Sequence, residues 1–496
     1  MRKFTCLFIT LLLLLTVTLA AASCANGAAN TTGTESAADT DTAEVDTKIY
    51  PDLPEKNWDG AECRILVSLP GGGDWADWGS RDIIADEENA DPINDAVYKR
   101  NLYVSDKYNV KINGIAKSGL TELTKKEVLG GTDDYHIVTD YLKSLIPNIT
   151  TGYLVDLTKV DMMDLSKPWY DQQCVKESAV MGKVFFITGD MILIDDDATA
   201  ALLFNKSVLT DNNLPNPYEY VHKNEWTYEN FCQMWQGVGK DLDGDSKITV
   251  ADQFGLVWQA DATISFLHAL GGRVATLDSD KLPVFTLEDE ISIRAFDAIA
   301  KYLYNKDLVL NCHDYSSKYS NIYHMLQDPV FTENRTLFNW VRMRVVQNYR
   351  GMEADFGILP MPKYDENQPS YYHTVNSYTC NTIEIPNSTA VDPEFAGFMI
   401  EAMSAESTYT LKNAYYDITL NTKVTRDEES REMLDIIFST RVYDTGSIYN
   451  WGNASDAVFS IIQKRDTNYV STIKKYEKNV SKQIEKFVEA FKKLDQ

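Results

Sequence analysis

The stretch ALLFNKSVLTDNNLPNP (201–217) predicts a buried strand, an Asn-Lys turn, a short helix and a loop bounded by prolines. Further along the chain, EWTYENFCQMWQGVGKDLDGDSKITVADQFGL (225–256) predicts a helix capped by Thr227, an acidic loop and a strand that begins at Phe254. A third stretch, DFGILPMPKYDE (355–366), predicts a strand that ends in a proline-rich connection. Short β-rich runs that alternate with amphipathic helices indicate packed layers of α and β structure.

The same alternation continues outside these three stretches. We expect a helix from Pro393, because Asp392 precedes it as a cap and apolar residues then recur at helical spacing. The strands that the pattern predicts are Arg64–Ser68, His136–Tyr141, Lys183–Thr188, Ala200–Phe204, Gly255–Trp258, Thr336–Trp340 and Phe356–Leu359.

Taken in their order, the three stretches resemble the family 1 extracellular solute-binding proteins, the group that resembles the maltose-binding protein. The resemblance extends to GYLVDLTKV (152–160) and to the helix from Pro393, and it covers about residues 60–460. It implies an α/β, two-lobed periplasmic-binding-protein-like fold of type II, with a multi-strand hinge and a ligand cleft between the lobes. It also implies the substrate-binding subunit of an ABC importer, which closes on a carbohydrate and delivers it to a membrane permease.

In such a fold the chain crosses between the lobes more than once, so neither lobe is continuous in sequence. We expect lobe 1 at residues 51–185 plus 329–372, and lobe 2 at 186–328 plus 373–460. Residues 461–496 alternate apolar residues with lysines and glutamates at helical spacing. This pattern predicts a C-terminal amphipathic helix that packs on the body, with a coiled-coil partner as the alternative.

The N-terminus predicts export and lipid anchoring. Residues 1–23 have the order of a secretory signal: two cations, an apolar core with five consecutive leucines, then small residues before Cys24. The cleavage region resembles the lipobox of bacterial lipoproteins, which implies acylation of Cys24; an ordinary secreted protein is the alternative. Residues 24–50 are polar and small, and so predict a flexible tether. We therefore expect an extracytoplasmic protein held at the outer face of the cell membrane by its lipid alone.

The composition narrows the classes of partner. The net charge is −26, which argues against nucleic acid and against an electrostatic hold on anionic lipids. The cysteines of the body are odd in number and scattered, without CxxC, so we expect buried thiols and neither a disulfide framework nor a cysteine metal site. A monomer without cofactor is expected, apart from the structural calcium considered next.

The acidic loop within residues 225–256 matches part of an EF-hand calcium loop. Carboxylates stand at positions one, three, five and twelve, and the backbone carbonyl of Lys247 stands at position seven. Two departures weaken the match, because Ser246 replaces the usual glycine and an aspartate replaces the usual glutamate. A solvated acidic turn is the alternative. The candidate ligands are Asp241, Asp243, Asp245, Lys247 and Asp252.

Aromatic and acidic side chains are the candidates for ligand contact, because flat rings fit the apolar faces of sugars and carboxylates orient their hydroxyls. Core packing is the alternative for each aromatic residue. The candidates are Trp75, Trp78, Trp169, Tyr170, Asp171, Asp190, Asp196, Trp340, Tyr372 and Trp451.

The sequence gives no reason to expect an enzyme. It contains neither GxSxG nor HExxH, and the histidines show no ligand spacing. A paired-carboxylate glycosidase remains an alternative in so acidic a chain, and so does a sensory or adhesive lipoprotein of the same fold. The ligand also stays open between sugars, other polyols and peptides.

Overall fold

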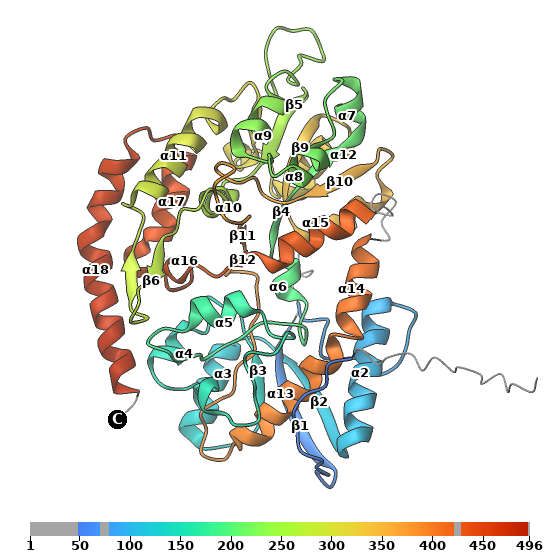
Figure 1. Ribbon diagram of the computed structural model, residues 1–496, viewed down its shortest axis with the longest axis vertical. Helices are drawn as coiled ribbons and strands as arrows, with labels where there is room; N and C mark the ends of the chain where they lie inside the picture. Colours follow the sequence, from blue (N-terminus) through green and yellow to red (C-terminus); the bar gives the residue numbers. More distant parts are fainter. Residues whose placement is uncertain (1–47, 70–78, 421–427, 495–496) are drawn as a thin grey trace, which may run out of the picture. The chain divides into compact units, whose positions relative to one another are not determined.

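Three parallel strands form the sheet of lobe 1. The structure is a computed structural model that describes residues 48–69, 79–420 and 428–494. The strands run in the order β2-β1-β3, with bounds β1 (Ala61–Ser68), β2 (Val110–Lys117) and β3 (Ile137–Thr139). Consecutive residues of β1 are buried on both faces, as expected for a parallel sheet covered by helices. The helices of lobe 1 are α2 (Pro92–Tyr108), α3 (Leu120–Gly130), α4 (Ile146–Thr150), α5 (Gln172–Ser178), α6 (Ile194–Asp197), α13 (Pro393–Ser407) and α14 (Leu411–Leu420) (Figure 1).

Lobe 2 contains a five-stranded mixed sheet in the order β10-β4-β9-β5-β8. Its strands are β4 (Ala200–Asn205), β5 (Phe254–Trp258), β8 (Val309–Asn311), β9 (Thr336–Arg342) and β10 (Phe356–Leu359). A separate hairpin of β6 (Ala275–Leu277) and β7 (Pro283–Phe285) lies near the C-terminal helix. The helices of lobe 2 are α7 (Lys206–Asp211), α8 (Pro217–His222), α9 (Tyr228–Trp235), α10 (Ala262–Ala269), α11 (Glu290–Leu303), α12 (Asp328–Thr332), α15 (Glu428–Ser439), α16 (Thr445–Tyr449) and α17 (Ala454–Gln463).

The stretches that carried the resemblance fold together in lobe 2. Asn205 ends β4 and caps α7 by accepting a hydrogen bond from the backbone of Val208. Thr227 caps α9, as its position predicted. The indole of Trp226 is buried and donates to the carbonyl of Pro360, at 2.8 Å, which joins the second stretch to the third.

Most of the predicted strands are confirmed, but the lobe boundaries are wrong. Only isolated bridges occur within Lys183–Thr188, and β2 was not predicted. Residues 329–372 were expected in lobe 1, yet β9 and β10 both pair with β4 of lobe 2. Within 373–460, Glu384 pairs with Val138 next to the sheet of lobe 1. Local sequence patterns identify strands, but they contain no information about partners more than a hundred residues away.

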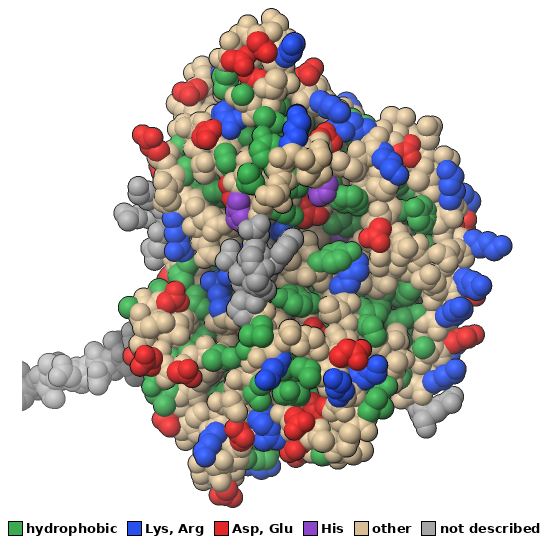
Figure 2. Space-filling model, turned by 180° about the vertical axis from the view of Figure 1, so that it is seen from behind, with side chains coloured by type: hydrophobic (Ala, Val, Ile, Leu, Met, Phe, Trp, Pro, Cys, Tyr) green, Lys and Arg blue, Asp and Glu red, His purple; other side chains and the backbone are tan. Residues whose placement is uncertain are grey.

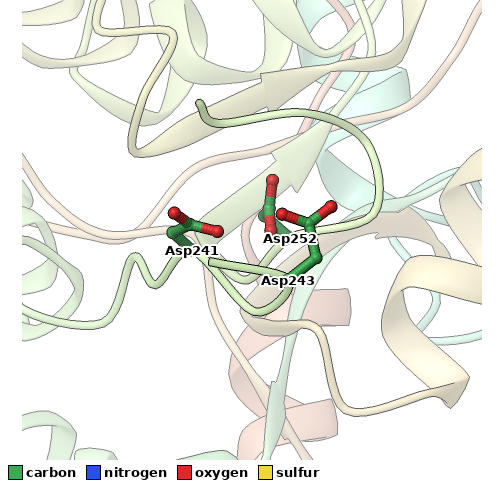
Figure 3. Close-up of side chains that lie close together, drawn as sticks. All are labelled: Asp241, Asp243 and Asp252. Atoms are coloured by element: carbon green, nitrogen blue, oxygen red, sulfur yellow. The ribbon is translucent and has the colours of Figure 1, made fainter. Parts of the chain in front are cut away.

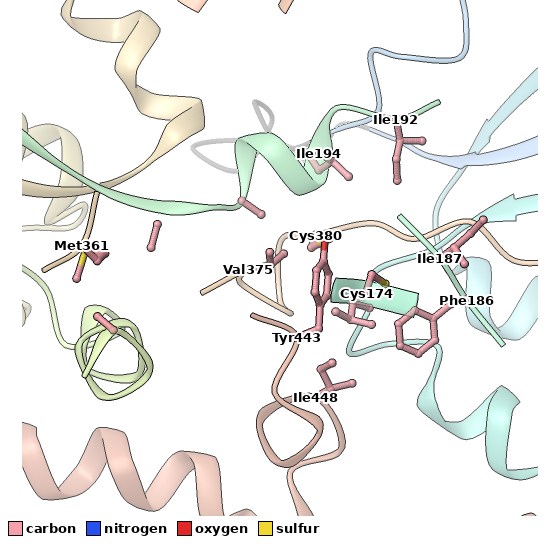
Figure 4. Packing of buried hydrophobic residues seen from close by; sticks show 14 of the residues in the cluster. Cys174, Phe186, Ile187, Ile192, Ile194, Met361, Val375, Cys380, Tyr443 and Ile448 are labelled. Atoms are coloured by element: carbon pink, nitrogen blue, oxygen red, sulfur yellow. The ribbon is translucent and has the colours of Figure 1, made fainter. Parts of the chain in front are cut away.

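Several chain segments pass between the lobes and lie side by side, as the resemblance implied. Thr199 pairs with Val375, and β11 (His373–Thr374) pairs in parallel with β12 (Arg441–Val442). We call these segments the hinge strands. Figure 4 shows buried side chains packed around them, among them Val375, Cys174 and Tyr443. The Tyr443 hydroxyl shares a hydrogen bond with that of Thr188, at 2.7 Å.

The C-terminal helix α18 (Tyr469–Lys493) packs on the body, as predicted, although it begins later than residue 461. The alternative, a coiled-coil partner for this helix, has no support here because its apolar face is buried against the chain itself. All five cysteines of the described residues are buried and free. No helix among the described residues is long and apolar enough to span a bilayer.

Candidate functional site

A cavity of about 400 Å³ lies at the carboxyl ends of the parallel strands of lobe 1. Loops gather at this edge because parallel strands all point the same way, and ligands commonly bind there. The wall is made by residues that follow β1, β2 and β3, together with a segment just after β11. The lining residues are Ser68, Leu69, Lys117, Ser118, Gly119, Leu120, Thr121, Asp140, Tyr141, Ser144, Tyr378 and Thr379.

A second cavity, of about 130 Å³, continues from the first toward lobe 2. Tyr378 lines both cavities, so the two meet at this side chain. The lobe 2 wall consists of residues after β5, including Asp261, and of residues from α17, including Asp456 and Phe459. The site therefore lies between the lobes, and we call it the cleft.

Tyr378 is the most exposed of these aromatic side chains, with 59% of its surface accessible. The ammonium group of Lys143 lies 3.8 Å from the ring centroid and also contacts the hydroxyl group. A tyrosine held in this way offers a flat apolar face and a polar rim, which is the pattern that suits a sugar ring.

Asp261 presents an unused acceptor in the cleft. One carboxylate oxygen is buried and has no hydrogen-bond partner among the described residues. The other oxygen lies 3.8 Å from the guanidinium of Arg342 and 3.5 Å from the hydroxyl of Tyr323. A buried acceptor without a partner is costly, so a ligand hydroxyl placed here would gain a strong hydrogen bond.

Arg342 and Tyr323 also line a third cavity, of about 310 Å³, in the wall of lobe 2. It is formed by the end of β9, the turn after β8 and the 3-10 segment Met343–Gly351. Its lining residues are His313, Ser316, Tyr319, Ser320, Asn321, Ile322, Tyr323, His324, Arg342, Arg344, Val345, Gln347 and Asn348. On the face drawn in Figure 2, histidine, lysine and arginine side chains lie among exposed hydrophobic ones across the middle of the molecule.

Four of the predicted ligand contacts come together, but in a different cavity. Tyr170, Asp171, Asp190 and Asp196 line a space of about 440 Å³ beside the hinge strands. Arg441 of β12 lies among these carboxylates and pairs with Asp171, Asp195 and Asp196. Burial raises the pKa of Asp195 to about 7. This ion network ties β12 to lobe 1, so its evident role is in the hinge.

The predicted tryptophans that the structure describes lie in the core. Trp169, Trp340 and Trp451 are at most 5% exposed, so none can contact a ligand in this conformation. Tyr372 lies under the guanidinium of Arg273, at 4.6 Å. Trp75, Trp78 and Cys24 lie outside the described residues. Tyr378, Asp261 and Arg342 were missed, although Asp261 follows an apolar strand directly, which is a usable signal for a residue at a cleft.

The predicted calcium loop brings three carboxylates together, as Figure 3 shows. Candidate ligand atoms of Asp241, Asp243 and Asp252 lie within 4.8 Å of one another. Ser246 takes a positive φ of 65°, the conformation for which an EF-hand loop uses glycine, and its backbone donates to Asp241. Hydrogen bonds from the backbone of Leu242 and Thr249 lower the pKa of Asp252. Asp245 is not part of this group, and its carboxylate accepts from the backbone of Lys247.

The loop geometry thus fits a hard cation in part. The backbone makes a sharp turn around the three carboxylates. Ser246 adopts the left-handed conformation of this turn although it is not a glycine. The acidic-turn alternative is also compatible, because backbone N–H groups already satisfy several carboxylate oxygens. Calcium therefore stays a prediction.

The sequence matches no protein-family model and no curated protein sequence. Solved structures do match. A sugar transporter protein from Rhizobium etli in an open conformation matches with a TM-score of 0.55 at 11% identity, over 85% of this chain and 99% of that chain. A cyclo/maltodextrin-binding protein complexed with maltotetraose gives 0.54 at 14% identity, over 86% and 97%. An ABC substrate-binding protein from Listeria monocytogenes in complex with cycloalternan gives 0.51 at 12% identity, over 86% and 99%.

The chain has the two-lobed, periplasmic-binding-protein-like fold. The α/β class and the multi-strand hinge expected from the sequence are confirmed. In this periplasmic-binding-protein-like chain, the cleft lined by Tyr378 and Asp261 lies between the lobes and beside the hinge strands, where closure of the lobes would enclose a ligand.

Proposed function

We propose that the chain is the extracytoplasmic substrate-binding protein of an ABC importer, and that it captures a carbohydrate, of oligosaccharide size, in the cleft. The observation that carries this proposal is Tyr378, an exposed ring shared by two cavities that together contact both lobes. Sugars need an apolar platform and hydrogen-bonding groups around it, and Asp261 supplies an acceptor beside this platform. A ligand held between the lobes favours the closed state by its greater affinity for that state.

The solved structures with the same fold support this reading by analogy, since two of them carry oligosaccharides. By the same analogy we propose that a membrane permease is the partner and that the protein delivers the carbohydrate to it. Glycoside hydrolysis is not part of the proposal, since two of the solved structures with this fold are described as binding proteins.

The proposal is tested by melting residues 48–496 in the presence of oligosaccharides of defined length. A ligand that binds only the native state must raise the melting temperature. Tyr378→Ala should weaken binding of any sugar that raises it by about tenfold or more, because one ring contact is lost. Tyr103→Ala is the matched control, since Tyr103 is an exposed tyrosine of α2 outside the cleft. Equal binding by all three proteins would place the sugar site elsewhere.

We also propose that acylated Cys24 holds the protein at the outer face of the membrane. The support is the order of cations, apolar core and small residues before Cys24, and the polar segment after it. Mass spectrometry of the N-terminal peptide should find a lipid on Cys24, and Cys24→Ala should release the protein into the medium. A soluble wild-type protein with an unmodified cysteine would exclude the anchor.

The third part of the proposal is a structural calcium ion at Asp241, Asp243 and Asp252. It is supported by the convergence of their carboxylates and by the left-handed turn at Ser246. This loop precedes β5, whose carboxyl end leads to Asp261, so a bound ion would stiffen the approach to the cleft.

A further inference from the structure

The cavity of about 440 Å³ beside the hinge strands is separate from the cleft, and we call it the hinge cavity. None of its lining residues lines the two cavities that meet at Tyr378. It is bounded by segments of lobe 1, by α14 and by α15, which packs on β10 of lobe 2. Its volume is in the range of ordinary small-molecule sites, so it has room for a ligand of its own.

Negative charge dominates the lining of the hinge cavity. Among the described residues that line it, the only cations are Lys412 and Arg441. Lys412 pairs with Asp190 at 3.1 Å, and Arg441 is shared by three further aspartates, as described above. The two cations therefore leave an excess of negative charge, which an added cation would reduce. The acidic lining residues are Asp171, Asp190, Asp195, Asp196 and Asp435.

Asp195 marks the deep end of the hinge cavity. Its side chain is only 2% exposed, yet its Oδ1 atom is buried and has no hydrogen-bond partner among the described residues. The other carboxylate oxygen lies 3.6 Å from Arg441, which is longer than a hydrogen bond. A buried acceptor without a donor is costly, so an N–H group of a ligand placed against Asp195 would stabilise it.

Asp435 marks the open end of the same cavity. It is exposed, its carboxylate accepts a hydrogen bond from the Tyr416 hydroxyl at 3.2 Å, and no ion pair joins it to a cation of the described residues. Tyr416 and Phe438 also line the cavity, with their ring centroids 5.8 Å apart. Aromatic rings cover alkyl chains and attract ammonium groups over their faces.

The spacing of these carboxylates does not favour a single metal ion. In the part of the chain that the structure describes, only Asp241, Asp243 and Asp252 bring three candidate ligand atoms within 4.8 Å of one another. A ligand that extends from buried Asp195 to exposed Asp435 needs a positive charge at each end and an apolar middle. A diamine has this pattern.

We propose that the hinge cavity binds an organic diamine, with one ammonium group against Asp195 and the other against Asp435. The alkyl chain lies along Tyr416 and Phe438. Because Asp195 belongs to lobe 1 and α15 packs on lobe 2, a bound diamine contacts both lobes beside the hinge strands. This site is independent of the cleft and of the ligand that the cleft takes.

Calorimetric titration of the protein tests the site with three probes of equal chain length: butanediamine, butylamine and butanediol. At pH 8 the amines are protonated, and the carboxylate of Asp195, whose pKa is about 7, is mostly charged. The diamine should bind about threefold or more tighter than the monoamine, because it meets a second carboxylate, and the neutral diol should not bind. Equal binding of the diamine and the diol would exclude a cation site.

Asp435→Asn tests the open end of the site. The amide oxygen still accepts from Tyr416, but the charge is lost, so diamine affinity should fall about threefold to tenfold while monoamine affinity stays the same. Glu432→Gln is the matched control, because it removes one exposed charge from the same helix at a residue that contacts His222 instead. Equal effects of the two substitutions would mean that Asp435 does not contact the diamine.

Variants at Ser439 test the cavity as a whole. Ser439 is exposed and lines the cavity, so the fold should accept a longer side chain there. Ser439→Lys adds an ammonium group that competes with the ligand, and it should bind the diamine about threefold or more weakly than Ser439→Met, which adds similar length without charge. If the two variants bind the diamine alike, the negative charge of the hinge cavity does not hold it, and the proposal is wrong.

Discussion

Phe491, near the end of α18, lies edge-on against Phe185, with the ring centroids 5.6 Å apart and the planes at 89°. At the start of the same helix, Tyr469 stacks on Phe296 of α11, at 5.1 Å. Phe185 precedes the hinge on the lobe 1 side, and α11 belongs to lobe 2. The C-terminal helix therefore packs on both lobes, and its aromatic residues should contribute to the stability of both.

Phe491→Ala should lower the free energy of unfolding by about 3–4 kcal/mol, because the ring is fully buried and its removal leaves a cavity. Chemical denaturation measures the change. The neighbouring exposed residue provides the control, and Lys492→Ala should change stability by less than about 0.5 kcal/mol. Similar effects of the two substitutions would mean that α18 is not docked at this end.

Glu401→Gln should make stability less dependent on pH. Burial raises the pKa of Glu401 to about 7, from an ordinary value of 4.5, and its carboxylate accepts a hydrogen bond from Tyr170. Between these two pH values the unfolded chain releases the proton while the folded chain keeps it, so the wild type loses stability as pH rises. The variant keeps the acceptor and has no proton to lose.

The difference between the two proteins should be small at pH 4.5 or below and should reach on the order of 3 kcal/mol in favour of the variant above pH 7. Urea denaturation at a series of pH values measures it. Glu489→Gln, on the exposed surface of α18, should leave the pH profile unchanged. Parallel profiles for the wild type and Glu401→Gln would contradict the raised pKa.

Arg441→Gln should destabilise the hinge by about 3–5 kcal/mol, because the buried carboxylates of Asp171, Asp195 and Asp196 lose their common cation. The loss should be greater at pH 8 than at pH 5, where Asp195, whose pKa burial raises to about 7, can be protonated. Arg431→Gln is the matched control, since Arg431 is about half exposed. A loss that is independent of pH would show that repulsion among these carboxylates is not its cause.

Calcium should raise the melting temperature of the wild type, and this rise should disappear in Asp252→Asn. A site that binds only the folded chain adds about 2.7 kcal/mol when calcium is at 100 times its Kd. Asp278→Asn serves as the control, because Asp278 is a turn aspartate that accepts backbone hydrogen bonds, as Asp252 does. The same rise in Asp252→Asn and Asp278→Asn would mean that calcium acts elsewhere.

Local patterns allowed correct prediction of most strands and of the capped helices. Ala200–Phe204 is a continuous apolar run, and Thr227 offers a hydroxyl at the position where a helix needs a cap. The lobe boundaries could not be predicted in this way, because β4 pairs with β9 and β10 only in three dimensions. A strand carries the same local pattern whichever sheet it joins.

The candidate site was predicted less well, for a physical reason. The sequence predicts Trp169 and Trp340 as ligand contacts, but both lie in the core. Burial of a large aromatic ring stabilises the folded chain, so a tryptophan is often a core residue. The ring that we propose as the sugar platform is Tyr378, whose neighbours in sequence are polar. Tyr378 differs from the other tyrosines by its position just after β11, and the sequence alone does not show that β11 ends at the cleft.

The interleaving of the lobes has a consequence for the synthesis of the chain. Asp140 donates its backbone hydrogen to Glu384, a residue 244 positions later. At about 5–20 residues per second, the segment that covers this edge of the first sheet reaches it roughly 10–50 s after the edge is made. During that interval Val138 and Ile187 lack Glu384 and Ile383, the residues with which they form bridges in the folded chain. We expect chaperones that bind unpaired apolar strands to recognise the nascent chain there.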